Sequence, residues 1–165
     1  MPNLYQSFDT ESRFWLSNLN NYNEAPFLKK HVKTNQSAQD VYQEVFGESL
    51  QCIENIKLCT QQVNTSTKIG KKSFAGRILF SVGTPKRKKR QNFPTLVLSD
   101  ILTTQNTVYK LMKEAERLSG ILRGIKGKVQ HADYGYLSAE EWYKLIIITL
   151  KSNKKRINTI NKMFI

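Results

Sequence analysis

Cysteine is scarce in this chain of 165 residues, and its two copies, Cys52 and Cys59, are too few for a disulfide framework. Apolar residues around them recur at helical spacing, and seven helical residues place the two Cα atoms roughly 10 Å apart at about 1.5 Å per residue. A disulfide needs Cα atoms within about 7 Å, so we expect both thiols to stay reduced. No Cys/His cluster has the spacing of a zinc site, and neither a metal nor another cofactor is predicted. Such cysteine usage favours an intracellular location, cytoplasmic or nuclear.

Long apolar runs are also absent. No stretch approaches the ~18 consecutive apolar residues of a membrane-spanning helix. The first residues, MPNLYQSFDTE, show no basic start followed by an apolar block. The sequence therefore predicts neither a membrane partner nor a secretory signal.

Acidic residues are few after residue 67, which makes the charge strongly asymmetric. The chain carries 26 Lys and Arg against 13 Asp and Glu, a net charge of +13. Residues 1–67 hold five basic and seven acidic residues, a net of −2, whereas residues 68–165 hold 21 and six, a net of +15. A polyanion is the natural partner of the second part. The near-neutral first part is predicted to serve packing or self-association, although one compact domain with skewed charge explains the same counts.

The length suits a single domain, residues 1–165, because domains typically hold about 100–200 residues. Apolar residues at three- and four-residue steps predict a cluster of helices in the near-neutral part. The expected helices are residues 10–22 with Asp9 as N-cap, a short helix from Pro26, residues 37–46 ending before Gly47, and residues 49–63.

The hydrophobic pattern changes after residue 70. Residues 73–83 (SFAGRILFSVG) and residues 92–99 (NFPTLVLS) are short, apolar and separated by the polar stretch TPKRKKRQ. Such a pattern is typical of a β-hairpin with a long loop. Pro94 favours an edge position, because proline donates no hydrogen bond to a strand ladder.

Two long helices are predicted to follow the hairpin. An apolar stripe from Val108 to Ile125 indicates a helix capped by Thr103 or Thr104, which glycines end or bend between residues 119 and 128. The pattern Ser138-x-x-Glu141 is a capping box that starts the last helix. The expected fold is α+β and mostly helical, with a helical cluster, a two-stranded basic hairpin and two long C-terminal helices.

The most conspicuous motif is the run of five cations that follows Pro85. Like charges at one per residue repel each other unless an anion neutralises them. The run resembles a monopartite nuclear localisation signal, which implies a nuclear import receptor as a partner. At the tip of a hairpin it also serves as a finger beside phosphates, and a solvated loop without a partner is the third alternative. Its residues are Lys86, Arg87, Lys88, Lys89 and Arg90.

Further residues are predicted to share a nucleic-acid surface with this run. The cations Lys68, Lys71 and Lys72 precede the first strand, Arg77 lies in it, and Arg123, Lys126 and Lys128 occupy a Gly-rich segment. Exposed rings stack on unpaired bases, and Tyr134 and Tyr136 in the polar stretch HADYGYLS are the predicted stacking residues. Phe74 and Phe93 are assigned to the core. The cations of the last helix, Lys151, Lys154, Lys155, Arg156 and Lys162, also suit a helix C-terminus by themselves.

Two other activities are alternatives to plain phosphate binding. The stretch LSDILTTQNTVYKLMKEAERL resembles a helix-turn-helix, but its turn is one residue short and has no glycine. His131 beside Asp133, Glu140 and Glu141 offers an acid and a base for RNA cleavage, although no motif specifies it.

The sequence predicts a non-enzymatic protein that binds RNA or DNA through phosphates, of the kind found as a small regulatory or nucleoprotein component of a virus, phage or mobile element. The alternatives are a small basic ribonuclease toxin and a structural subunit of a capsid or ribonucleoprotein assembly, which also forms homo-oligomers.

Overall fold

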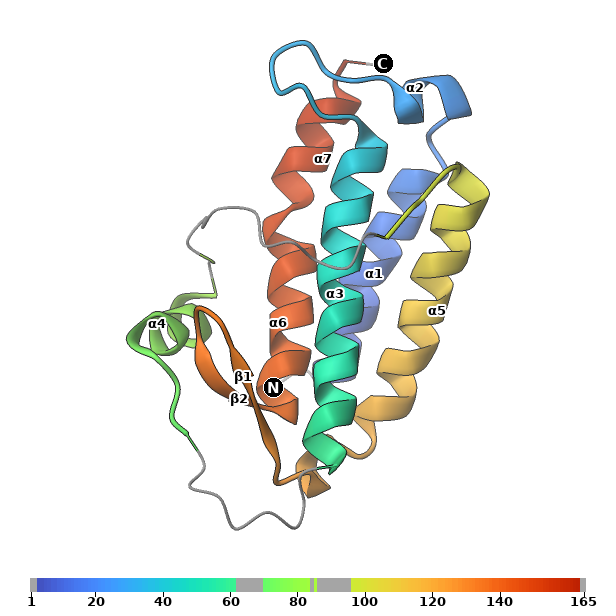
Figure 1. The fold of residues 1–165 in the computed structure, drawn as a ribbon. Helices are drawn as coiled ribbons and strands as arrows, with labels where there is room; N and C mark the ends of the chain where they lie inside the picture. The colour runs from blue at the N-terminus through green and yellow to red at the C-terminus, as the bar shows by residue number, and fades with distance from the viewer. Residues whose placement is uncertain (1–2, 62–69, 84, 86–95, 164–165) are drawn as a thin grey trace.

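The computed structural model describes residues 3–61, 70–83, 85 and 96–163. A bundle of α-helices fills most of it, and a short helix and a two-stranded hairpin pack on one side (Figure 1). In chain order the elements are α1 (Leu4–Leu19), α2 (Glu24–Leu28), α3 (Ala38–Gln61), α4 (Phe74–Val82), α5 (Ile101–Ser119), the 3₁₀ helix η1 (Leu122–Gly124), β1 (Lys128–His131), β2 (Gly135–Ser138), α6 (Ala139–Ser152) and α7 (Lys154–Asn161).

The core surrounds α3, which packs against α5, α6 and α7. Large aromatic side chains dominate it, and Trp15, Tyr42 and Tyr143 each bury a polar group that is hydrogen-bonded. The Trp15 indole donates to the Leu150 carbonyl at 3.1 Å, and the Tyr42 hydroxyl donates to the Trp15 carbonyl at 2.7 Å. The Tyr143 hydroxyl donates to the Ala115 carbonyl at 3.1 Å, so α1, α3, α5 and α6 are joined through buried hydrogen bonds.

Three helices in the near-neutral part differ from the sequence prediction, and one of them, α2, begins at Glu24 rather than at Pro26. Helix α1 begins at Leu4 because Asn3 and Gln6 form a capping box, and Asp9 lies inside the helix in an ion pair with Arg13 at 2.7 Å. Helix α3 runs without a break through Gly47, where two helices were expected. Gly47 is buried, and its packing in the bundle outweighs its low helix propensity.

The largest correction concerns residues 73–83, which form helix α4 rather than a strand. Ser73 caps it by accepting the Gly76 amide at 3.1 Å, and Gly83 ends it with a φ of 71°. A short apolar run is compatible with a strand or with a helix, and here the helix is formed. Residues 96–99 have no regular secondary structure, and the rest of the second expected strand lies outside the described residues.

The antiparallel hairpin lies later in the chain than predicted, in β1 and β2, where His131 pairs with Gly135 and Lys128 with Ser138. Gly135 has a φ of 75°, a conformation that favours glycine. The α+β, mostly helical fold with a two-stranded hairpin is therefore confirmed, but the location predicted for the hairpin was wrong.

Helix α4 is attached to this hairpin by the residues that precede it. The Tyr136 amide donates to the Lys71 carbonyl at 3.2 Å, and the Ser73 amide donates to the Tyr134 carbonyl at 2.9 Å. Gly76 packs directly on the Tyr134 carbonyl and leaves no room for a Cβ atom. These contacts place the start of α4 against the outer edge of β2.

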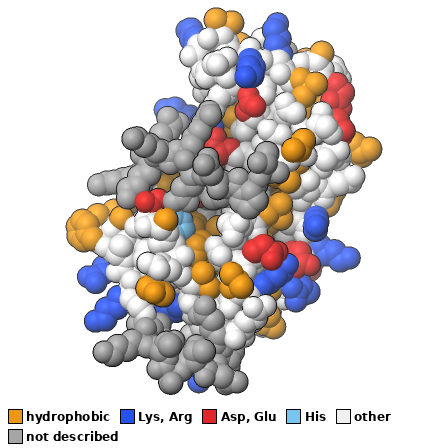
Figure 2. All heavy atoms as spheres, in the orientation of Figure 1, with side chains coloured by type: hydrophobic (Ala, Val, Ile, Leu, Met, Phe, Trp, Pro, Cys, Tyr) orange, Lys and Arg blue, Asp and Glu red, His pale blue; other side chains and the backbone are white. Residues whose placement is uncertain are grey.

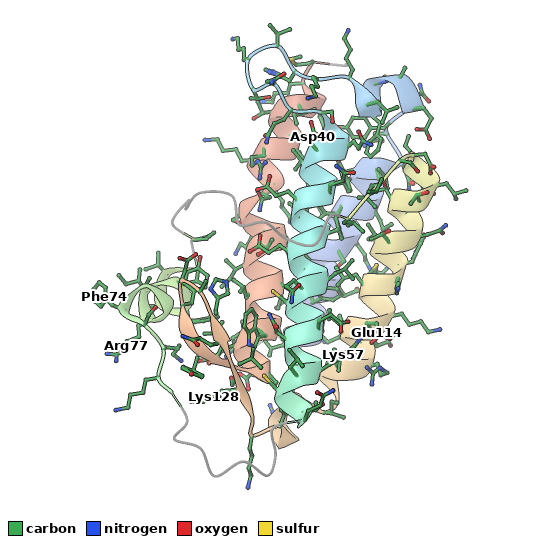
Figure 3. The ribbon with its side chains drawn as sticks, viewed as in Figure 1. Asp40, Lys57, Phe74, Arg77, Glu114 and Lys128 are labelled. Carbon is green, nitrogen blue, oxygen red and sulfur yellow. The ribbon has the colours of Figure 1, made fainter. Side chains whose placement is uncertain are left out.

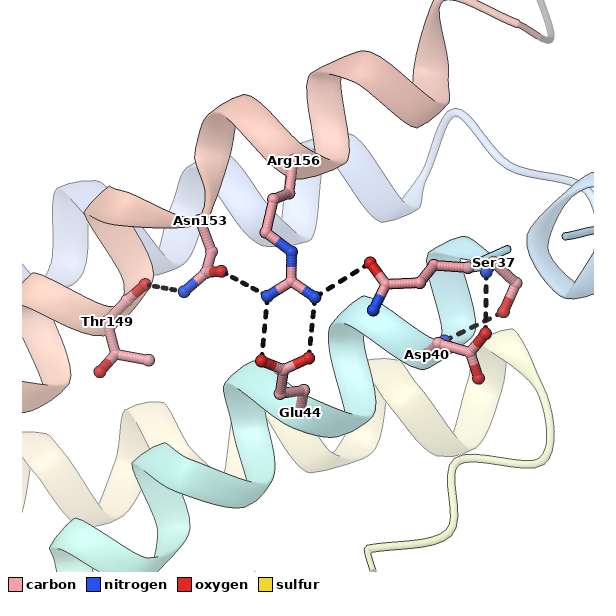
Figure 4. Close-up of polar contacts among 7 residues, drawn as sticks. Ser37, Asp40, Glu44, Thr149, Asn153 and Arg156 are labelled. Carbon is pink, nitrogen blue, oxygen red and sulfur yellow. Dashed lines mark hydrogen bonds and ion pairs between the residues drawn. The ribbon is translucent and has the colours of Figure 1, made fainter. Parts of the chain in front are cut away.

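The last helix begins at the predicted capping box of Ser138 and Glu141 and bends at Asn153 into α7. Arg156 secures the bend (Figure 4). Its guanidinium donates to both carboxylate oxygens of Glu44 at 3.1 and 2.8 Å and to the Asn153 and Gln36 side-chain oxygens. This cation of the last helix therefore has a structural role, and a bidentate pair suits its planar group.

The helix-turn-helix interpretation is wrong. Helix α5 begins at Ile101 behind an Asp100 cap and continues through Thr107, where the motif requires a turn. Cys52 and Cys59 both lie on α3 and are free and buried, as the spacing predicted. Within the part of the chain that the structure describes, no helix combines the length and apolar character needed to cross a membrane.

Candidate nucleic-acid interface

Part of the predicted interface falls outside the described residues. Lys68 and the run from Lys86 to Arg90 belong to this part, so the phosphate finger and the import signal stay predictions. The remaining predicted residues are all placed by the structure, and they separate into cations without an ion pair to a described carboxylate, one structural cation and two packed aromatic rings.

Three cations without such an ion pair lie on α4, beside it and on the hairpin. Lys71 precedes α4, and Arg77 projects from α4, which is a helix here rather than the predicted strand. Lys128 is half-buried on β1. Figure 3 labels Arg77 and Lys128 on this side of the molecule, and Figure 2 shows Lys and Arg side chains at the same lower left edge. No carboxylate of the described residues lies within ion-pair distance of these three cations.

Two further predicted cations lie on the segment that leads into the hairpin. Arg123 belongs to η1 and Lys126 follows it, and both are exposed without an ion-pair partner among the described carboxylates. Lys126 is two residues from Lys128 on β1. The unpaired cations therefore lie around the hairpin. One is on β1, others are on the segment that leads into β1, and the rest are on or just before α4, which packs against β2.

Lys72 differs from its neighbours because it is used inside the fold. Its ammonium group forms an ion pair with Glu141 and lies 5.7 Å from the centre of the Phe80 ring. Glu141 also accepts the Ser138 amide at 2.9 Å, so this pair connects α4 to the start of α6. Lys72 is thus a structural cation rather than an available phosphate ligand.

The aromatic predictions are reversed by the structure. Phe74, assigned to the core, is 78% exposed on α4. Tyr134 is half-buried with its ring stacked on His131 at 4.4 Å, and the half-buried Tyr136 packs against Gly70. Figure 3 shows Phe74 and Arg77 projecting from the outer side of α4. The signal for Phe74 was a helical period in which Gly76 and Leu79 are buried, but this short apolar run was predicted as a strand because it fits a strand as well.

The residues considered for RNA cleavage have structural roles. The Asp133 and Tyr134 amides donate to His131 Nδ1 at 3.0 and 3.3 Å, so the proton of the neutral ring lies on Nε2. His31 holds the Lys33 amide in the same way at 3.0 Å. Glu140 pairs with Lys144 at 2.6 Å. A histidine that acts as a general base needs an available nitrogen lone pair, and the Nδ1 lone pair of His131 already accepts these two amides. The nuclease interpretation therefore gains no support from these residues.

Two of the C-terminal cations are also structural. Lys154 pairs with Glu11 at 2.6 Å and lies 4.6 Å from the centre of the Phe14 ring, and Arg156 pairs with Glu44. Lys154 therefore attaches α7 to α1, and Arg156 attaches α7 to α3. In residues 3–61, 70–83, 85 and 96–163, no group of three or more His, Cys, Asp or Glu side chains is arranged to hold a metal ion.

No family model, curated protein or solved structure matches this chain. Its function is therefore inferred from its own residues.

Proposed function

We propose that this protein binds single-stranded nucleic acid on a surface formed by α4, the residues just before it and the hairpin. The observation that carries the proposal is the exposed ring of Phe74 with two unpaired cations, Lys71 and Arg77, each three residues away in the sequence. An exposed aromatic ring offers a face on which an unpaired base stacks, and neighbouring cations neutralise the flanking phosphates.

The charge of the chain favours a polyanion over other partners for this surface. The net charge is +13, and the surface cations are not neutralised by described carboxylates. Each phosphate that such a cation contacts releases condensed counterions, which makes binding favourable at low salt. In the sequence, the run of five cations begins three residues after Gly83, the cap of α4, and adds to the positive charge tethered to this surface.

The composition of α4 favours single strands over a duplex. A helix that reads a major groove presents polar side chains to the base edges. The outward side chains of α4 instead include Phe74 and Val82, which are 78% and 67% exposed, with Arg77 between them along the helix. Apolar and aromatic groups of this kind suit the flat faces of unstacked bases.

The test is a titration of labelled single-stranded and duplex oligonucleotides, followed by fluorescence anisotropy. We expect single strands to bind more tightly, and Phe74→Ala to weaken their binding by about 1–3 kcal/mol, the usual contribution of one stacked base. Tyr109→Ala is the matched control, because Tyr109 is 59% exposed on α5, which lies across the bundle from α4 (Figure 1). Equal effects of the two substitutions would remove Phe74 from the interface.

A further inference from the structure

A polar cavity of about 250 Å³ lies between α3, α6 and the hairpin. Helix α3 contributes Glu48, Gln51 and Asn55, which are three and four residues apart and so share one face of the helix. The hairpin contributes Gln130 and His131. The cavity is smaller than the roughly 300–1,000 Å³ of pockets for drug-sized ligands, so its size suits one small ring system.

One wall of this cavity holds a buried hydrogen-bond donor without an acceptor. Trp142 lines the cavity and is 3% exposed, and its indole Nε1 is buried without a hydrogen-bond partner. Trp15, the other tryptophan of the chain, has its indole satisfied by the Leu150 carbonyl. Buried donors are nearly always paired in folded proteins, so the Trp142 indole is a donor that a ligand acceptor in the cavity would satisfy.

Three side-chain amides also line the cavity. The amide groups of Gln51, Asn55 and Gln130 make no hydrogen bond with any described residue. Each amide offers both donors and an acceptor, so the lining is able to match a ligand edge that carries both kinds of group.

Glu48 adds a carboxylate to this lining. Burial raises its pKa to about 6, nearby Glu44 acts in the same direction, and a hydrogen bond from Thr149 and the charge of Arg156 oppose the shift. The carboxylate is therefore ionised at neutral pH and accepts hydrogen bonds only. A ligand that meets Glu48 there must present an N–H or O–H donor.

Two aromatic rings contribute to the rest of the lining. The His131 and Trp142 rings lie 5.3 Å apart and are tilted by 40°, and Tyr134 stacks behind His131 at 4.4 Å. Flat rings of this kind favour a flat ligand. Pockets that receive an unstacked base combine such aromatic contacts with hydrogen bonds to the base edge.

We infer that this cavity binds a nucleobase with an exocyclic amino group, whose N–H donates to Glu48 while a ring nitrogen or carbonyl accepts from the Trp142 indole. Adenine, cytosine and guanine carry such a group. Uracil and thymine do not, and their ring N–H lies between two carbonyl oxygens that repel a carboxylate. The inference rests on the proposed function, since the base would belong to a strand held by the α4 and hairpin surface. His131 and Gln130 belong to the same hairpin as Lys128 of that surface.

The test is a two-dimensional NMR titration of the full ¹⁵N-labelled chain with adenosine, cytidine, guanosine and uridine. The two tryptophans give two indole signals, and Trp15 serves as an internal control because its indole is buried and already bonded. We expect at least one amino-bearing nucleoside to shift the Trp142 signal saturably, with uridine binding at least tenfold more weakly and Trp15 unaffected. Nucleosides carry no phosphate, so the titration is independent of the cationic surface.

Glu48→Gln should weaken binding of the amino-bearing nucleoside at least tenfold. Glu54→Gln is the matched control, with the same change on the same helix, because Glu54 is exposed and pairs with Lys57 outside the cavity. If no nucleoside shifts the Trp142 signal while oligonucleotides bind, the cavity inference is refuted and the proposed function stands. If nucleosides shift the signal while oligonucleotides do not bind, the proposed function fails instead. Equal effects of the two Gln variants would also refute the role of Glu48.

Discussion

Replacing Glu48 by Gln should stabilise the protein at neutral pH. Burial raises the pKa of Glu48 from its ordinary 4.5 to about 6, because the surrounding protein removes water from the charged form. The folded protein therefore holds the proton to a higher pH than the unfolded chain. The contribution of Glu48 to stability is fully present below pH 4.5 and is lost as the pH rises through about 6.

The size of the effect follows from the shift. A difference of about 1.5 pKa units corresponds to about 2 kcal/mol at 1.36 kcal/mol per unit. Gln stays neutral at every pH, keeps nearly the same volume and still accepts the hydrogen bond from Thr149. In a domain of this size, about 2 kcal/mol raises the melting temperature by about 4–8 °C.

The assay is thermal unfolding of the wild type and the variant between pH 4 and pH 8. We expect equal stability near pH 4 and a gap that opens through pH 4.5–6 and stays constant above it. Glu44, Arg156 and His131 face the same region and are present in both proteins, so their contributions cancel in the comparison. Glu54→Gln should show no such gap. A variant that is no more stable than the wild type at pH 7.5 would refute the buried, poorly solvated state of Glu48.

Two further predictions concern the packing of the fold. Gly76→Ala should lower the free energy of unfolding by about 1–3 kcal/mol in chemical denaturation, because its Cβ would collide with the Tyr134 carbonyl. Gly124→Ala, which meets nothing within 4 Å, should change it far less. Burial raises the pKa of Cys59 to about 11 and that of Cys52 well above its usual range, so neither thiol should react with a disulfide reagent at pH 8 until the protein unfolds. Fast reaction of either thiol in the folded protein would contradict the burial of these two cysteines on α3.

Local signals in the sequence were sufficient for the C-terminal elements. The Ser138 and Glu141 capping box and the apolar stripe of α5 depend on residues three or four positions apart, and both predicted their helices. The cap of α5 was misassigned to Thr103 or Thr104 because Asp100, one turn earlier, satisfies the Thr103 amide at 2.6 Å. Neighbouring residues with similar capping ability are hard to rank from sequence.

The site depended on contacts that sequence spacing does not report. Lys72 became structural only because α6 brings Glu141 to it, and Phe74 became exposed only because α4 docks on the hairpin through Gly76. The cavity was not predicted, since its lining comes from α3, the hairpin and α6, which are far apart in the chain. The run of apolar residues at the end of α4 fits a strand as well as a helix. The hairpin was therefore predicted at residues 73–99 instead of in β1 and β2.

The most direct test of a localised interface compares two sets of charge reversals in single-stranded oligonucleotide binding at several salt concentrations. The first set reverses Lys71, Arg77 and Lys126 to Glu, and the second reverses Lys29, Lys30 and Lys33, which are exposed between α2 and α3 at the far end of the bundle (Figure 1). Both sets change the formal charge by −6.

The account predicts that the first set weakens binding at least tenfold. It should also make the negative slope of log K against log salt shallower by about 2, since each of three lost phosphate contacts on a single strand contributes about 0.7. The second set should leave the slope nearly unchanged. Equal losses from the two sets would show that affinity follows the net charge, and would contradict a binding surface on α4 and the hairpin.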